Sequence, residues 1–281
     1  MNYIDILNKT AKQFSSIICL GLDPVIEDIP INGKPKEQII EFYTALLNKI
    51  IQTGIYPSAV KPNYAFYAQY GIDGIEALIT VINIYKEAGL PIILDFKRGD
   101  IGKTARAYAK EAFDFFNADA VTLSPYLGYD SISPFIENYP DKGYYILTKT
   151  SNKSSAEIQD ISVNDEPLYL YMAKRLLKWY HPGIGSVAGA TYPEELSSII
   201  NIFNSSKKDI PLLIPGVGSQ GGDMNAILNI LKESPNYLIH RINSSSAINY
   251  AYKKYDDLKF DDAAVKALKE LNESVNSILD F

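Results

Sequence analysis

The 281-residue sequence has one cysteine and two histidines, and this scarcity excludes several kinds of chemistry. Cys19 alone can form neither an intrachain disulfide nor a cysteine-based zinc cluster. His181 and His240 are too few for a histidine-rich metal site. Acidic residues outnumber basic ones, 33 to 27, which argues against non-specific binding to nucleic acid or to an anionic membrane.

Long apolar runs are also missing, so we expect no segment to span a bilayer. The N-terminal stretch carries Asp5 and spaces Ile4, Leu7 and Ala11 like one face of a helix, which is not typical of a signal peptide. Hydrophobic residues make up 47% and charged residues 21% of the chain, as in soluble globular proteins. These features predict a cytoplasmic protein that begins with a helix.

Eight short apolar runs alternate with longer segments of helical period. The runs are rich in Ile, Leu, Val and Tyr and are bounded by Gly, Pro, Asp or Ser, as buried parallel strands are. They occupy residues 17–22, 58–61, 91–97, 119–124, 143–148, 184–189, 210–215 and 237–243. Amphipathic segments of helix length lie between them, at residues 37–51, 74–88, 104–116, 168–179, 193–203 and 224–231.

This alternation predicts a parallel sheet, and eight units in fewer than 300 residues favour a single (β/α)8 (TIM) barrel domain over residues 1–281. The alternative is a doubly wound open sheet, which would carry a glycine fingerprint after its first strand. Asp23 and Pro24 follow that strand here instead. Residues 151–167 are polar and long for a connection between strand and helix, and we expect them to form a mobile loop above the barrel mouth.

The charged end of the third run gives the sharpest functional signal. Asp95 and Lys97 are two positions apart on a buried strand, so both side chains point into the barrel mouth. Buried charges are unfavourable unless they are paired, and Lys61 at the end of the second run can complete a Lys–Asp–Lys row. Such a row is either a lysine acid and electrostatic catalyst or a salt bridge that fills the barrel.

Other features have a functional and a structural interpretation. Asp100 is either a site residue or a plain N-cap of the next helix. The glycine-rich segment 215–223 lets backbone N–H groups approach an anion, and barrels often bind phosphate at this place. Its alternative is a tight turn without a ligand, but its position favours phosphate. We expect Cys19 and His240 to be buried packing residues.

Seven stretches of the chain resemble orotidine 5′-phosphate decarboxylase in its second bacterial subfamily. The D-x-K-x-x-D-I-x-x-T pattern together with KPN-x-AF and PGVG-x-QGGD is very specific. The resemblance implies a (β/α)8 barrel, a homodimer, and a reaction without metal or cofactor. That reaction converts orotidine 5′-monophosphate (OMP) to uridine 5′-monophosphate (UMP) and CO2, the last step of de novo UMP synthesis. The stretches are CLGLDP (19–24), KPNYAFYAQYG (61–71), DFKRGDIGKTA (95–105), SPYLGYDSISPF (124–135), KTSN (149–152), AGATYPEEL (188–196) and PGVGSQGGD (215–223).

The same resemblance assigns a role to each matching residue. It implies that Lys97 protonates C6 of the pyrimidine, that Asp95 lies against the departing carboxylate, and that Asp100 reaches into the partner subunit's site. The remaining residues are expected to contact the substrate. They are Asp23 and Lys61 at the ribose hydroxyls, Ile101 and Thr104 beside Asp100, Ser151 at the base, and Pro215, Gly216, Gly218 and Gln220 at the base and phosphate end.

One position departs from the family pattern. Relatives follow the eighth strand with Ser-Arg, whose guanidinium grips the phosphate, whereas the aligned residue here is Ser246. Arg241, five residues earlier, is the candidate replacement. Loss of such a charge-assisted contact would cost roughly 1.5–3 kcal/mol of binding. This departure keeps open a catalytically weakened, nucleotide-binding dimer.

A third hypothesis is a magnesium-dependent sugar-phosphate enzyme of the same barrel superfamily. That enzyme needs extra acidic ligands near Asp95 and Lys97. The second run ends here in Lys61, Pro62 and Asn63, none of which is acidic. The intact set of Lys61, Asp95, Lys97 and Asp100 favours the decarboxylase over both alternatives.

Overall fold

A computed structural model describes residues 1–216 and 223–281 of the chain. Eight parallel strands form one sheet in the order β2-β1-β10-β9-β8-β5-β4-β3. Isolated bridges from Val60 to Ile92 and from Asn63 to Asp95 join β2 to β3, so the sheet closes on itself. The strands are β1 (Ile18–Leu22), β2 (Ala59–Pro62), β3 (Ile93–Arg98), β4 (Ala120–Leu123), β5 (Gly143–Lys149), β8 (Ile184–Ala188), β9 (Leu212–Ile214) and β10 (Arg241–Ser244). The closed barrel confirms the predicted fold and excludes the open sheet.

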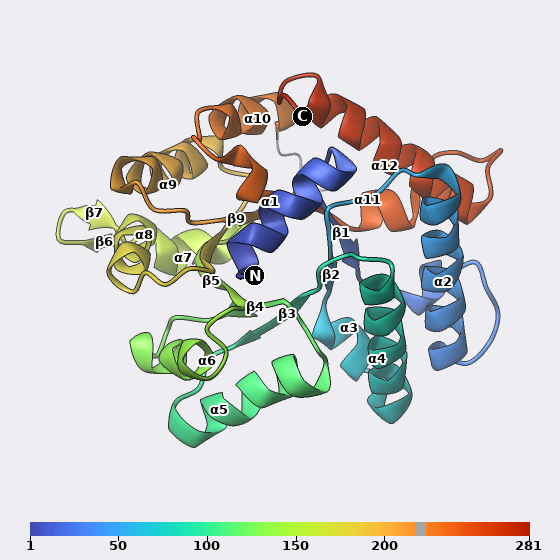
Figure 1. The fold of residues 1–281 in the computed structure, drawn as a ribbon, viewed down its shortest axis with the longest axis horizontal. Coiled ribbons are helices and arrows are strands. Elements are labelled where there is room, and N and C mark those ends of the chain that lie inside the picture. Colours follow the sequence, from blue (N-terminus) through green and yellow to red (C-terminus); the bar gives the residue numbers. More distant parts are fainter. Residues whose placement is uncertain (217–222) are drawn as a thin grey trace.

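Helices surround the barrel as an outer ring, because each has one apolar face to bury against the strands (Figure 1). The six predicted helical segments are all present. Five have ends within three residues of the prediction, and the segment 104–116 divides into an α-helix at Gly102–Lys110 and a π-helical turn at Glu111–Phe115. The six helices are α2 (Pro35–Thr53), α4 (Gly71–Glu87), α5 (Gly102–Lys110), α8 (Leu168–Lys178), α9 (Pro193–Ser206) and α10 (Met224–Lys232). Sequence periodicity did not indicate α3 (Tyr64–Ala68), α6 (Ser133–Asn138), α11 (Ser246–Asn249) or α12 (Phe260–Asn276).

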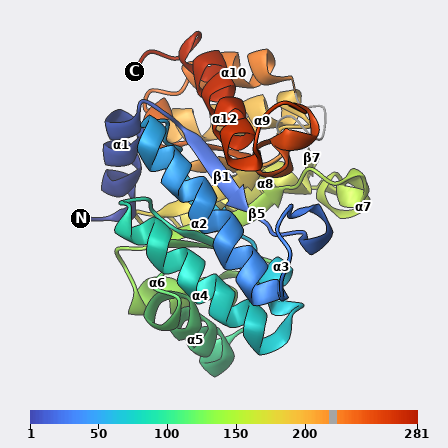
Figure 2. The same cartoon turned by 90° about the vertical axis from the view of Figure 1, so that its right-hand side faces the viewer.

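The apolar core has two parts, one on each face of the sheet. The larger part fills the space between strands and helices. The smaller part lies inside the barrel, where Tyr3 and Leu7 of α1 (Tyr3–Phe14) pack with strand residues such as Cys19 and Ile93. Figure 2 shows α1 at one end of the barrel and α3 and α7 (Ala156–Gln159) at the other. Since α1 closes the N-terminal end of the strands, their C-terminal ends form the accessible mouth.

The eighth strand starts later than its apolar run predicts. Tyr237–Ile239 form a single 3-10 turn, and β10 begins only at Arg241. His240 lies between them, fully enclosed: its Nδ1 accepts a hydrogen bond from the Leu212 N–H at 3.1 Å, and its Nε2 lies 3.0 Å from Ser234 Oγ. Burial lowers the pKa of His240 to about 3, so the ring is neutral. His240 and Cys19 are buried, as predicted.

The segment predicted as a loop at 151–167 contains secondary structure of its own. It holds a 3-10 turn at Lys153–Ser155, the short helix α7, and a two-stranded antiparallel hairpin of β6 (Ser162–Val163) and β7 (Glu166–Pro167). Local side-chain hydrogen bonds, described below, fold it back on the end of β5. In the described part of the chain, no helix combines the length and the apolarity that a membrane span requires.

Candidate active site

Three charged side chains form a continuous row at the mouth of the barrel. The Asp95 carboxylate on β3 accepts a hydrogen bond from Lys61 Nζ on β2 at 3.0 Å and from Lys97 Nζ at 2.6 Å. Asp23, directly after β1, extends the row, with Oδ1 3.9 Å from Lys61 Nζ. The structure therefore brings together the Lys–Asp–Lys row expected from strand alternation.

The backbone at Lys97 departs from regular strand geometry. Its φ of 47° lies in the left-handed region, which is unfavourable for a residue with a Cβ. The pairing of β3 with β4 shifts between Leu94 and Arg98, so Lys97 sits in a bulge. Its N–H bonds to Thr122 Oγ1 at 3.0 Å in place of a strand partner. Strain of this kind persists only where the surroundings fix it, and it concentrates at functional sites.

Thr122 on β4 was not singled out from the sequence, yet it links both parts of the row. Its hydroxyl donates to Asp95 Oδ1 at 2.8 Å while accepting from the Lys97 backbone. Asn63, inside the KPN motif, lies 3.4 Å from Asp95 Oδ2 through its amide nitrogen. Four groups thus hold the Asp95 carboxylate: two ammonium ions, one hydroxyl and one amide.

Electrostatics keeps Asp95 and Lys61 charged although both side chains are nearly buried. Burial alone raises the pKa of Asp95, but Lys61 and Lys97, with the hydrogen bonds from Lys97 and Thr122, outweigh it and hold that pKa well below its usual value. Burial likewise lowers the pKa of Lys61, and the charges of Asp23 and Asp95 reverse this and raise it. Lys61 is 5% exposed at its side chain, whereas Lys97 is 48% exposed. The Lys97 ammonium is therefore the accessible end of a fixed charge array.

This array borders a cavity of about 660 Å³ at the mouth, which lies within the size range of small-molecule sites, ~300–1,000 Å³. One side of the cavity is polar, with Asp23, Lys61, Asp95 and Lys97. The side toward the barrel interior is apolar and is formed by Leu147, Val187 and Leu213. The arrangement suits a flat apolar ring with a polar substituent directed at the charged row.

Two buried acceptors on the polar side have no hydrogen-bond partner within the described residues. They are Asp23 Oδ1 and Asn243 Oδ1, and both residues line the cavity. Buried polar atoms are nearly always satisfied, so these oxygens are suited to donors from a ligand, such as hydroxyl groups. Asn243 was missed from the sequence. Its place on β10, two residues after Arg241, is the signal that could have pointed to it.

Asp100, Ile101 and Thr104 lie outside this cavity. Ile101 is the N-cap position of α5, and its side chain is 51% exposed. Asp100 makes no side-chain cap on α5. Among the described residues, its carboxylate accepts a hydrogen bond from the neighbouring Ile101 N–H alone, at 2.7 Å. The plain N-cap interpretation of Asp100 is therefore wrong. Ile101 and Thr104 are exposed and Asp100 is half-buried, and the three residues form an edge beside the mouth.

The remaining expected contacts fall on the opposite side of the cavity. Ser151, Pro215 and Gly216 line it. Gly216 has φ 96°, a conformation that glycine adopts without strain. Gly218 and Gln220 lie outside the described residues.

Arg241 is in a different place from the one expected. It is completely buried inside the barrel near α1, where its guanidinium donates to the Leu7 carbonyl at 2.7 Å and to Thr10 Oγ1 at 3.0 Å. It also bonds to the carbonyls of Leu238 and His240. Arg241 thus faces the closed end of the barrel and cannot replace an arginine at the mouth.

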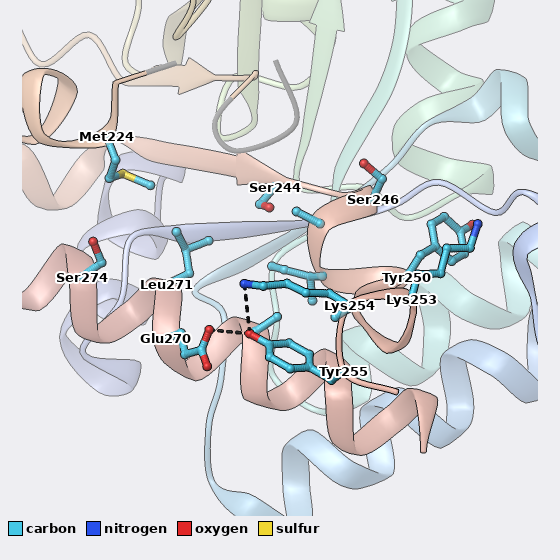
Figure 3. A pocket seen from close by; sticks show the side chains of 14 residues that line it. Met224, Ser244, Ser246, Tyr250, Lys253, Lys254, Tyr255, Glu270, Leu271 and Ser274 are labelled. Carbon is cyan, nitrogen blue, oxygen red and sulfur yellow. Dashed lines mark hydrogen bonds between the residues drawn. The ribbon is translucent and has the colours of Figure 1, made fainter. Parts of the chain in front are cut away.

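Ser246 lies at the boundary between two cavities. It lines the mouth cavity and also a second, mostly apolar cavity of about 530 Å³ that extends toward α12 (Figure 3). Lys254 and Glu270 border the second cavity, joined through the Tyr255 hydroxyl. A long side chain at position 246 therefore has space on either side.

The fold and the charged row define a class: a (β/α)8 barrel enzyme whose site uses paired lysine and aspartate side chains at the C-terminal ends of its strands. The family described as "Orotidine 5'-phosphate decarboxylase / HUMPS family" matches residues 16–239. The chain belongs to this family. It is 40% identical to the orotidine 5′-phosphate decarboxylase of Dechloromonas aromatica over 280 residues, which is 98% of this chain and 99% of that protein. It is 37% identical to that of Thermomicrobium roseum, over 99% of this chain and 96% of the relative.

Solved structures give the same result. The OMP decarboxylase of Leishmania donovani superposes with a TM-score of 0.81 and 35% identity, covering 99% of both chains. The UMP synthase of the same organism gives a TM-score of 0.83 and 36% identity, but this chain spans only 56% of that longer protein.

The strained backbone at Lys97 yields a prediction about stability. We expect Lys97→Gly to be more stable than Lys97→Ala by about 1 kcal/mol, because glycine adopts a left-handed φ without the Cβ penalty. Both variants lose the same amine, so their difference isolates the backbone. Urea unfolding of the two proteins measures it. An alanine variant at least as stable as the glycine variant would contradict the left-handed geometry.

Proposed function

We propose that this protein decarboxylates OMP to UMP and CO2, the last step of de novo UMP synthesis, in the cytoplasm, without a metal or an organic cofactor. The observation that carries the proposal is the Lys61–Asp95–Lys97 row, with its accessible ammonium at the border of the cavity. The full-length similarity to decarboxylases supports the same reaction.

In the proposed reaction, the bond between C6 and the carboxyl carbon breaks, and its electron pair stays at C6. CO2 leaves, and a proton from the Lys97 ammonium forms the new C6–H bond. Lys97 is left neutral and regains a proton from water. A preorganised cation is suited to this step because negative charge develops at C6, and fixed charges in a site with little water stabilise such charge strongly.

Asp95 has two roles in this proposal. It holds Lys97 Nζ at 2.6 Å, so the ammonium does not need to reorganise during the reaction. Its own carboxylate lies on the side where the substrate carboxylate is expected. Lys61 is nearly buried against Asp95 and compensates the negative charge that the substrate carboxylate adds beside Asp95.

The rest of the substrate follows the polarity of the cavity. We place the ribose hydroxyls at Asp23 and Lys61, because Asp23 Oδ1 has no donor among the described residues, with Asn243 as a further acceptor. The pyrimidine ring lies on the apolar side, with Ser151 at its edge. The phosphate lies toward Pro215 and Gly216, near Ser246.

We also propose a homodimer in which Asp100 and Thr104 contribute to the partner's site. Large apolar residues are exposed at Ile101, 51%, and in the segment after β4, at Tyr126, 87%, and Leu127, 47%. This segment lies beside the end of β3, where the Ser124 N–H donates to the Arg98 carbonyl at 2.7 Å. Exposed apolar groups of this size are typical of protein interfaces. The absence of a capping role for Asp100 leaves its carboxylate available across such an interface.

Magnesium chemistry fits these residues poorly. The two carboxylates of the row, Asp23 and Asp95, both face the Lys61 ammonium. The position between them, where a divalent ion would bind two acidic ligands, is held by a cation of the protein itself.

The first prediction on activity concerns Lys97. We expect Lys97→Ala to abolish turnover, since no other ammonium of the row is exposed to the cavity to the same degree. Wild-type protein should decarboxylate OMP after treatment with EDTA, followed by the ultraviolet change of the pyrimidine. Circular dichroism controls for the fold of the variant. Activity that disappears with EDTA and returns with magnesium would favour the sugar-phosphate hypothesis instead.

A second prediction concerns the phosphate end. Ser246→Arg should lower KM roughly ten- to hundredfold, the equivalent of about 1.5–3 kcal/mol for a hydrogen bond to a charged group. Ser246→Gln, which is long but uncharged, is the matched control and should change KM much less. An unchanged KM in the arginine variant would mean that position 246 does not face the phosphate.

The shared site can be tested by mixing two inactive variants. Asp100→Ala and Lys97→Ala should each be inactive, because each breaks both sites of the dimer. Unfolding and refolding an equal mixture should restore about a quarter of wild-type activity, since half of the dimers are mixed and each of these has one intact site. A mixture that stays inactive would show that Asp100 acts within its own subunit or not at all.

A further inference from the structure

Lys149, at the end of β5, is a buried cation that the proposed reaction does not use. Its side chain is 1% exposed, and it does not line the mouth cavity, although Leu147 and Thr150 do. The pairing of β5 with β8 shifts between Leu147 and Lys149, which takes the lysine out of the regular alternation. Its ammonium lies over the rings of Tyr169, 5.4 Å from the centroid, and Tyr192, 4.9 Å from the centroid.

A buried ammonium is stable only with a compensating charge. Within the described residues, Asp160 is the one carboxylate in ion-pair contact with Lys149. Asp160 follows α7 directly and precedes the hairpin of β6 and β7. The ion pair therefore joins the two ends of the loop 150–159, which contains α7. Aromatic faces on both sides of the lysine add cation–π attraction.

A second pair, one residue further into the loop, strengthens this closure. Gln159 Oε1 accepts the Thr150 N–H at 2.9 Å, and its Nε2 donates to Thr150 Oγ1 at 2.8 Å. Residue 149 therefore pairs with residue 160, and residue 150 with residue 159, so two adjacent pairs close the base of the loop. The next residue is Ser151, which lines the mouth cavity.

Ser151 is also confined from the opposite side. Gly189, after β8, donates its N–H to the Lys149 carbonyl at 2.8 Å. A Cβ at Gly189 would lie 2.9 Å from both the N and the Cα of Ser151, closer than real contacts allow. The backbone of Ser151 therefore lies directly on this glycine, between β8 and the closed loop.

We propose that Lys149 is a positioning residue: the pair of its buried ammonium with the Asp160 carboxylate fixes the loop base so that Ser151 faces the pyrimidine in the cavity. The inference rests on the proposed function, because it assumes that the ligand carries a pyrimidine base. The role belongs to the base end of the site alone. Lys149 should therefore affect ligands that have a base and leave the binding of the sugar phosphate unchanged.

Two ligands separate these effects: UMP, which has the base, and ribose 5-phosphate, which lacks it. We expect Lys149→Met to weaken UMP binding about tenfold, the scale of losing one hydrogen bond to the base, and to change ribose 5-phosphate binding less than twofold. Calorimetric titration of full-length protein measures both. Lys149→Arg, which keeps the charge, should restore part of the UMP affinity. Lys153→Met is the matched control, since this lysine of the same loop is exposed, and it should leave both affinities unchanged.

Asp160→Asn tests the same ion pair if Lys149→Met does not fold, and Gly189→Ala tests the position of Ser151 independently of that pair. The first removes the compensating charge from the loop side, and the second pushes Ser151 away from β8. Equal weakening of both ligands would indicate a merely structural role and overturn the inference, as would unchanged UMP binding in folded variants. Wild-type protein that neither binds UMP nor converts OMP would overturn the proposed function and, with it, the role of Lys149.

Discussion

The site depends on one interaction, the Asp95 carboxylate held between two ammonium ions. Without Asp95, the ammonium groups of Lys61 and Lys97 would repel each other. Without the two lysines, the nearly buried carboxylate of Asp95 would be poorly solvated. Lys61 from β2 and Lys97 from β3 meet at Asp95 because a closed parallel barrel brings the ends of adjacent strands together. This network holds the unfavourable φ of Lys97. The residue therefore lowers the stability of the fold while it supplies the proposed chemistry.

Much of the fold and the centre of the site followed from simple periodicity. Short apolar runs bounded by turn residues predicted all eight strands, because strands covered on both faces are apolar at most of their positions. Alternation of side chains then placed Asp95 and Lys97 on one face and Lys61 beside them. These arguments hold because a barrel strand is buried on both faces, which leaves few other arrangements for its side chains.

The predictions from sequence are incomplete or wrong where the local backbone departs from the regular alternation of a strand. Nothing in the residues around Lys97 or Lys149 indicates the register shifts of β3 and β5, since neither position is a glycine. Arg241 points into the barrel as alternation requires, but its depth depends on the N-terminal helix, whose Leu7 carbonyl and Thr10 hydroxyl bind it. Contacts between residues more than 200 positions apart leave no pattern in a single sequence.

The most direct test of the central claim restores only the charge at position 97. In Lys97→Cys protein, alkylation with bromoethylamine rebuilds a side chain of lysine length with an amine, whereas iodoacetamide adds an uncharged group. Burial raises the pKa of the Cys19 thiol to about 12, so this single native cysteine does not compete. We predict that OMP turnover returns by at least about a hundredfold only with the amine, on the scale of losing or regaining one preorganised electrostatic group. Equal activity of the two alkylated proteins would contradict the account.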